Sequence, residues 1–187
     1  MAKALTLPQL KRQLKEMTHQ ELIDLISTLY KENKSTKDLI NLKFQGDSFE
    51  EKVFEEYKEK AEKIIHPKRS RLGIGFDIKS LKALFKDYQK LNPKSVYLLE
   101  LQAFYLEGGL EFTNTFGDID MTFYNYLCTL YSNIVDTIFD EDEDEGEQLF
   151  QRFKERLASY IEQADFGWGV QEYFLDAYME LISYFGE

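Results

Sequence analysis

The chain contains few of the residues that form disulfides, zinc sites and histidine-based catalytic centres. Its 187 residues include one cysteine, Cys128, and two histidines, His19 and His66. A single cysteine excludes an intramolecular disulfide and leaves a thiolate zinc site without enough ligands. With two histidines, the chain offers few residues that could act as the base of a hydrolytic site. These shortages favour a reducing, cytoplasmic setting and disfavour several classes of enzyme.

Turn-forming residues, positive charge and long apolar runs are scarce as well. Three Pro and ten Gly are too few for the many turns of an all-β domain. No run approaches the roughly 20 apolar residues of a membrane span, and Lys11 and Arg12 interrupt the N-terminus before a signal-peptide core is complete. The formal charge of −11 opposes binding to nucleic acids or anionic membranes.

What the chain does contain is helical patterning. Its hydrophobic content of 43% and its long segments of Leu, Lys, Glu, Tyr and Phe predict an all-α protein of eight or nine helices. Thr18 and Glu21 have the spacing of a capping box that opens a helix through Lys31. The apolar residues of that helix fall on one face, which we expect to be buried: Leu22, Leu25, Ile26 and Leu29.

Breaks in the pattern predict three segments. Residues 1–65 form an N-terminal helical region, residues 66–76 form a basic linker containing Gly and Pro, and residues 77–187 form a C-terminal region. We expect the C-terminal helices to pack as antiparallel pairs, in a bundle or a short solenoid. Phe-Gly occurs at 116–117 and again at 166–167, each time before an aromatic-rich helix, which is consistent with stacked helix pairs.

Within the C-terminal region, helix ends are predicted from capping residues. Pro93 is expected at the first position of a helix, and the pair Gly108 and Gly109 is expected to end that helix. The acidic run at 140–147 carries seven acids around one glycine. Because these charges repel one another, we expect a solvated loop or a fraying helix end there.

The stretch from Gly108 to Tyr124 is the best candidate for a site, because small, amide and acidic residues interrupt the helical pattern. Its oxygen-bearing side chains are of the kind that hold Mg²⁺ or Ca²⁺, although the spacing is not that of a calcium loop. The candidate metal ligands are Glu111, Asp118 and Asp120, with Asn114 adding an amide oxygen. The competing interpretation is helix capping by Asp118 or Asp120.

Two further groups are candidate ligand sites. The cations Lys68, Arg69 and Arg71 lie beside two glycines and could hold a phosphate. The competing interpretation, which we favour, is a solvated basic linker that pairs with acidic helices nearby. Trp168 lies between two glycines and could stack on a ligand. Its alternative role is core packing under a tight turn.

Four motifs occur in order along the chain, and their order resembles an uncharacterised bacterial family of helical proteins, a domain of unknown function. They are the opening Leu-Pro-Gln-Leu-Lys-Arg-Gln-Leu-Lys, Pro67-Lys68-Arg69, the run Glu-Phe-Thr-Asn-Thr-Phe-Gly-Asp-Ile-Asp from Glu111, and Gly167-Trp168-Gly169. The resemblance implies a helical cytoplasmic protein. The family has no assigned activity, so it gives no residue a role.

Three functions are compatible with this sequence. The leading one is a non-enzymatic interaction module in which a groove between helices accepts a peptide or a partner helix, because apolar content is high and catalytic residues are few. The second is a Mg²⁺-dependent enzyme or binder acting on a phosphorylated substrate, which requires the basic linker to meet the acidic stretch. The third, which the overall charge disfavours, is a nucleic-acid-binding hairpin formed by the first two helices.

Overall fold

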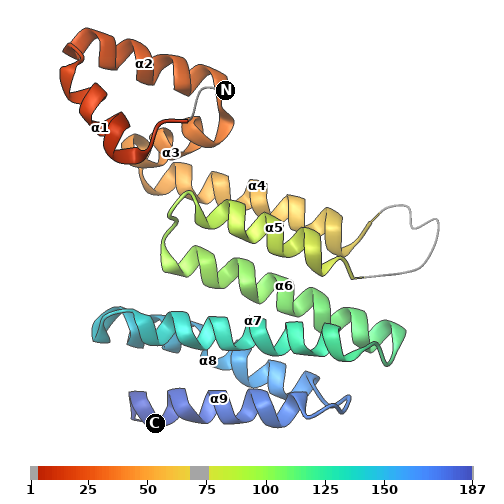
Figure 1. Cartoon of the computed structure of the whole chain (residues 1–187). Helices are drawn as coiled ribbons and strands as arrows, with labels where there is room; N and C mark the ends of the chain where they lie inside the picture. Colours follow the sequence, from red (N-terminus) through yellow and green to blue (C-terminus); the bar gives the residue numbers. More distant parts are fainter. Residues whose placement is uncertain (1–3, 68–75, 187) are drawn as a thin grey trace. The chain divides into compact units, whose positions relative to one another are not determined.

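The structure, a computed structural model, describes residues 4–67 and 76–186, and within these ranges it contains nine α-helices and no β-strand (Figure 1). The predicted all-α fold is therefore confirmed. The helices are α1 (Leu7–Glu16), α2 (His19–Glu32), α3 (Lys34–Gln45), α4 (Asp47–Ile65), α5 (Ile78–Gln89), α6 (Ser95–Phe116), α7 (Met121–Asp140), α8 (Glu143–Gln163) and α9 (Val170–Phe185). None of them is long and apolar enough to cross a lipid bilayer.

The chain divides into two compact units, and the division falls inside α4, between Glu50 and Glu51. Most of α4 therefore belongs to the second unit. The sequence pattern predicts a boundary between two helical regions later in the chain, at the basic linker after residue 65. Residues 68–75 of that linker lie outside the described residues.

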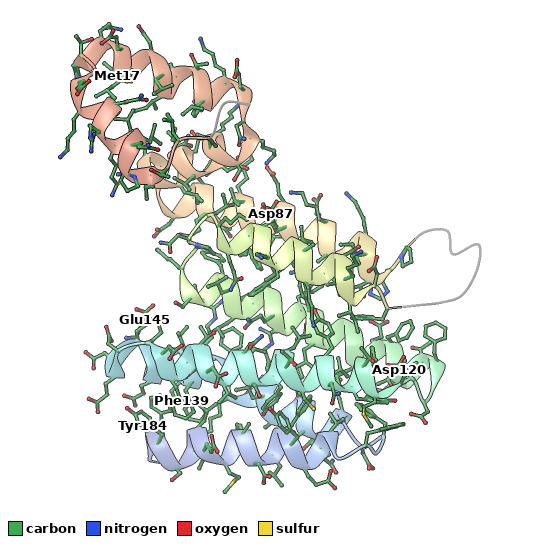
Figure 2. The ribbon with its side chains drawn as sticks, viewed as in Figure 1. Met17, Asp87, Asp120, Phe139, Glu145 and Tyr184 are labelled. Carbon is green, nitrogen blue, oxygen red and sulfur yellow. The ribbon has the colours of Figure 1, made fainter. Side chains whose placement is uncertain are left out.

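The first unit contains α1, α2 and α3, and its helix starts follow the sequence. The predicted capping box at α2 is confirmed, because the Thr18 backbone N–H donates to the Glu21 carboxylate at 2.7 Å and the Glu21 N–H donates to the Thr18 hydroxyl at 3.2 Å. Met17 lies at the bend just before this cap (Figure 2). Both partners lie within four residues of each other, so the sequence alone specifies this helix start.

The prediction of a buried stripe on α2 is wrong. Ile26 is 51% exposed and Leu29 is 46% exposed, and neither α1 nor α2 has a buried residue. The helix is amphipathic as its spacing predicts, but amphipathic spacing does not provide a second surface to pack against. A helical unit this small cannot cover every apolar face it presents.

The second unit contains most of α4 together with α5 to α9, and it holds the buried apolar core. Helix α7 contacts α6, α8 and α9 (Figure 1). Aromatic stacking contributes to this packing, since the rings of Tyr131 on α7 and Phe174 on α9 lie 4.1 Å apart and nearly parallel. Figure 2 shows Phe139 and Tyr184 side by side at the other end of the same pair, with their rings 5.3 Å apart.

Gly108 and Gly109 do not end a helix as predicted, because α6 continues through them to Phe116. Both glycines are buried at close contacts between helices. A Cβ atom at Gly108 would lie 2.7 Å from Cγ2 of Ile65, and one at Gly109 would lie 2.4 Å from Cδ2 of Leu127. The glycines let α4 and α7 approach the middle of α6, and the helix ends instead at Gly117, with a φ of 81°.

Two other predicted boundaries are also corrected. Pro93 precedes α6 but is not its first residue, since the N-cap is Lys94. The acidic run is mostly helical: α7 extends to Asp140, Asp142 caps α8, and the acids from Glu143 lie in the first turn of α8. Negative side chains there meet free backbone N–H groups and the positive end of the helix dipole, which offsets their mutual repulsion. Figure 2 shows Glu145 at this junction.

Candidate functional site

The turn between α6 and α7 is short and its backbone is tied down by side chains. The Thr113 hydroxyl donates to the Gly117 carbonyl at 3.2 Å. Asp120 is the N-cap of α7 and accepts a hydrogen bond from the backbone N–H of Phe123 at 2.9 Å (Figure 2). Of the two predicted capping residues, Asp120 takes this role, so its carboxylate serves the helix rather than a ligand.

The break between α8 and α9 has an unusual backbone. Gly167, Trp168 and Gly169 all have positive φ, at 89°, 60° and 71°. Positive φ is easy for glycine but uncommon for tryptophan, and its cost has to be met by contacts of the side chain.

Those contacts join the two breaks. The Trp168 indole Nε1 donates to Oδ1 of Asp118 at 2.7 Å, and the Tyr124 hydroxyl donates to the same oxygen at 3.1 Å. The Tyr124 ring is stacked on both Phe166 and Trp168, with centroid distances of 5.2 and 5.6 Å. The cluster of Asp118, Tyr124, Phe166 and Trp168 is called the loop clasp below. Both breaks lie at helix ends, and the loop clasp brings them into contact.

The three candidate metal ligands perform different tasks. Asp118 accepts two hydrogen bonds in the loop clasp, Asp120 caps α7, and Glu111 lies 3.7 Å from Nε2 of His66. Asn114 is exposed near the end of α6. Across residues 4–67 and 76–186, no three His, Cys, Asp or Glu side chains gather in a way that could hold a metal ion. The described structure therefore does not bring the predicted Mg²⁺ ligands Glu111, Asp118 and Asp120 together around one point.

The remaining reactive side chains are the cations of the basic linker and Cys128. Lys68, Arg69 and Arg71 lie outside the described residues, so whether they approach Asp118 stays a prediction. Burial raises the pKa of the half-buried Cys128 thiol to about 11. A thiol with that pKa is protonated at neutral pH, and so it is a poor nucleophile.

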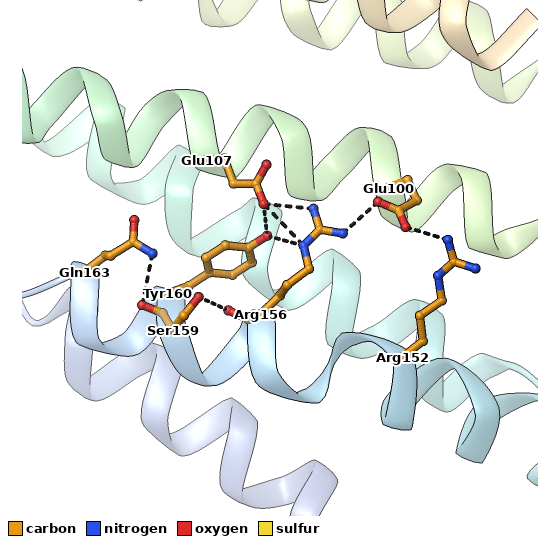
Figure 3. Close-up of polar contacts among 7 residues, drawn as sticks. All are labelled: Glu100, Glu107, Arg152, Arg156, Ser159, Tyr160 and Gln163. Carbon is orange, nitrogen blue, oxygen red and sulfur yellow. Dashed lines mark hydrogen bonds and ion pairs between the residues drawn. The ribbon is translucent and has the colours of Figure 1, made fainter.

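Helices α6 and α8 are joined by an ion-pair network that the sequence analysis does not predict (Figure 3). Arg156 donates to Glu100 at 2.7 Å and to Glu107 at 2.8 Å, Arg152 donates to Glu100 at 2.8 Å, and the Tyr160 hydroxyl donates to Glu107 at 2.6 Å. The seven-residue spacing of the acids and the four-residue spacing of the arginines were the available signal. Because these charged groups satisfy one another, the network joins two helices and offers little to a ligand.

The first unit offers a different kind of site, an exposed apolar surface. Between residues 4 and 50 no apolar side chain is buried, and the buried side chains are Asp38, Asn41 and Glu50. Lys34 pairs with Asp38 at 2.8 Å, and the Tyr30 hydroxyl donates to Asn41 at 3.1 Å. Six large apolar side chains of α1 and α2 are exposed, and together they are called the apolar face below: Leu7, Leu10, Ile23, Leu25, Ile26 and Leu29.

Comparison with known proteins adds nothing to this geometry: no family model, no curated protein and no solved structure matches the chain. The resemblance to an uncharacterised bacterial family therefore stays a prediction.

Proposed function

We propose that this protein is an interaction module whose first unit binds an amphipathic helix of a partner protein through the apolar face of α1 and α2. The observation that supports the proposal is the inversion of burial in the first unit, where three polar side chains are buried and nine large apolar ones are exposed, six of them on α1 and α2. Exposed apolar patches mark sites of protein interaction.

The spacing of the apolar face favours a helix as the bound element. Leu25, Ile26 and Leu29 form an apolar stripe along α2, and two amphipathic helices bury such stripes by packing against each other. Lys11, Arg12 and Lys15 lie on α1 close in sequence to Leu10. We therefore expect acidic residues along the polar edge of the partner helix, which would complement these cations and speed association.

The same proposal places the protein in the cytoplasm. Its single cysteine cannot form an intramolecular disulfide, and a protein that keeps a lone thiol is suited to a reducing compartment. The rival proposal of a Mg²⁺-dependent enzyme has no comparable observation in its favour, because Asp118, Asp120 and Glu111 make separate contacts and the described residues contain no cluster that could hold a metal ion.

Site-specific photocrosslinking in cells that carry the protein naturally would test the proposal. A crosslinking residue is placed at Ile26 in the full chain and, as a control, at Leu175, an apolar residue of α9 with 45% exposure. We expect position 26 to capture one protein through a peptide with amphipathic helical spacing, and position 175 not to capture it. With the purified partner, Ile26→Glu should weaken binding at least tenfold, and Leu175→Glu should leave it unchanged.

Two results would contradict the proposal. Equal capture of the same proteins from both positions would indicate nonspecific contact. Crosslinks from position 26 to peptides of this chain itself would mean that the apolar face is covered by a second copy or by the protein's own second unit, which mixed isotope labelling separates.

A further inference from the structure

The second unit contains a pocket of about 230 Å³ between α5, α6 and α7. It is smaller than the roughly 300–1,000 Å³ of pockets for drug-sized ligands, so it suits a small metabolite. Its lining residues are Lys82, Phe85, Lys86 and Gln89 from α5, Gln102 and Tyr105 from α6, and Tyr126, Thr129, Leu130 and Asn133 from α7. The pocket is formed by residues of one unit and is separate from the apolar face.

Two buried polar groups in this pocket have no hydrogen-bond partner. Tyr105 is 0% exposed and Gln102 is 4% exposed, and none of the described residues pairs with the Tyr105 hydroxyl or with Oε1 of Gln102. A buried polar atom without a partner is costly, and native proteins keep few of them. Burial and the neighbouring Tyr126 and Tyr57 raise the pKa of Tyr105, so its hydroxyl stays protonated and can both donate and accept.

Two cations stand at the exposed edge of the pocket. Lys82 and Lys86 are one helical turn apart on α5, and both side chains are exposed. In the described part of the chain neither forms an ion pair with a carboxylate, although the protein carries a formal charge of −11. Two like charges at this spacing disfavour each other slightly, and an anion between them would relieve that repulsion.

Aromatic rings also line the pocket. The Phe85 ring meets the Tyr105 ring edge-on at 6.2 Å, and the ammonium group of Lys82 lies 5.2 Å from the centroid of the Tyr126 ring. Aromatic surfaces of this kind bind flat apolar groups well. The lining of the pocket therefore combines two exposed cations, aromatic rings, and two residues whose buried polar atoms have no partner among the described residues.

We propose that this pocket binds a small aromatic carboxylic acid that carries a hydroxyl or amino group at the end opposite the carboxylate. The carboxylate pairs with Lys82 and Lys86, and the ring packs against Phe85 and Tyr126. Gln102 and Tyr105 are buried, so their side chains turn toward the ligand, whose hydroxyl or amino group then donates to Oε1 of Gln102 and hydrogen-bonds to the hydroxyl of Tyr105. The polar end of such a ligand meets two buried groups that lack a hydrogen-bond partner among the described residues.

Titration of the ¹⁵N-labelled full chain with 4-hydroxybenzoate, followed by NMR, tests this proposal. We expect saturable shifts at residues of α5, α6 and α7 that line the pocket. Two matched probes separate the contributions: benzoate lacks the hydroxyl group and should bind roughly tenfold more weakly, and 4-hydroxybenzamide lacks the charge and should bind about fivefold more weakly. No saturable shift with any of these probes at millimolar concentration would overturn the proposal, because the pocket would then hold only water.

Variants identify the groups that recognise the ligand. Lys86→Gln should weaken binding of 4-hydroxybenzoate about fivefold, whereas Lys79→Gln, an equal charge change at an exposed position of α5 outside the pocket, should not. Tyr105→Phe keeps the ring and removes only the hydroxyl, so it should weaken 4-hydroxybenzoate and leave benzoate unchanged. Equal effects of Lys79→Gln and Lys86→Gln, or equal loss of both ligands in Tyr105→Phe, would overturn the assigned contacts.

Discussion

Trp168 donates its indole N–H to the carboxylate of Asp118 across 2.7 Å, although 50 residues separate the two in the chain. The bond links the turn after α6 to the break between α8 and α9. It also holds a tryptophan at a φ of 60°, a conformation that is normally costly for any residue except glycine. The stacking of Tyr124 on Phe166 and on Trp168 completes the loop clasp.

Breaking the loop clasp should destabilise the second unit by a modest amount. Trp168→Phe keeps an aromatic ring but removes the donor, and Asp118→Ala removes the acceptor. Because Trp168 is 52% exposed, we expect a coupling energy of about 0.5–1.5 kcal/mol between the two changes in a double-mutant cycle followed by urea unfolding. A coupling energy of zero would show that the hydrogen bond makes no net contribution.

The close approach of α6 and α7 gives a second prediction, at Gly109. An alanine there would put its Cβ within 2.4 Å of Leu127 Cδ2, and overpacking of a buried contact costs about 1–3 kcal/mol. This cost should exceed the gain of about 1 kcal/mol from replacing glycine inside a helix. In a Leu127→Ala background the clash is gone, so Gly109→Ala should become neutral or stabilising. Urea unfolding of the four proteins measures both effects, and an equal cost in both backgrounds would exclude the clash.

Local interactions were the part of this structure that the sequence predicted well. The Thr18 and Glu21 capping box and the cap at Asp120 each join residues three apart, so residue type and spacing determine them. The same reasoning is wrong at Gly108 and Gly109. These two residues are glycine because Ile65 and Leu127 of other helices pack against them, not because their own helix ends there. Local pattern cannot distinguish a glycine that ends a helix from one that admits a neighbour.

The candidate site shows the same limit. Asp118 and Trp168 were both predicted as site residues, but for separate ligands, and only the folded chain brings them together. The spacing of apolar residues in α2 predicts an apolar stripe, but whether the side chains of that stripe are buried depends on what packs against them. The pocket between α5, α6 and α7 had no sequence signal, since its lining combines single residues from three helices.

The ion-pair network of α6 and α8 predicts unequal roles for its two arginines. Arg156 bonds to both Glu100 and Glu107 and is 34% exposed, whereas Arg152 bonds only to Glu100 and is 58% exposed (Figure 3). Removing one partner leaves the others unpaired, and the penalty grows with burial. After allowing for solvent screening, we expect Arg156→Met to cost about 1–2 kcal/mol and Arg152→Met to cost less than about 1 kcal/mol in thermal or urea unfolding. Equal costs would mean that the network is not centred on Arg156.

The same network should make stability depend on pH through Glu100. Burial opposes ionisation of Glu100, but hydrogen bonds and charge from Arg156 and Arg152 outweigh it and hold its pKa below the ordinary value of 4.5. A carboxylate whose pKa is lowered by folding contributes stability above its unfolded pKa, and that contribution is lost as the pH falls through the folded pKa.

Glu100→Gln removes this titration and so isolates it from the other acids. We expect the variant to be less stable than the wild type at pH 7, by roughly 1–3 kcal/mol, and the difference to shrink as the pH falls below about 4.5. Urea unfolding across a pH series measures the difference, with Glu155→Gln, an exposed acid on α8, as the matched control. That control should differ little from the wild type at any pH. A Glu100→Gln difference that stays constant down to pH 3 would show that Glu100 contributes through packing rather than through its charge.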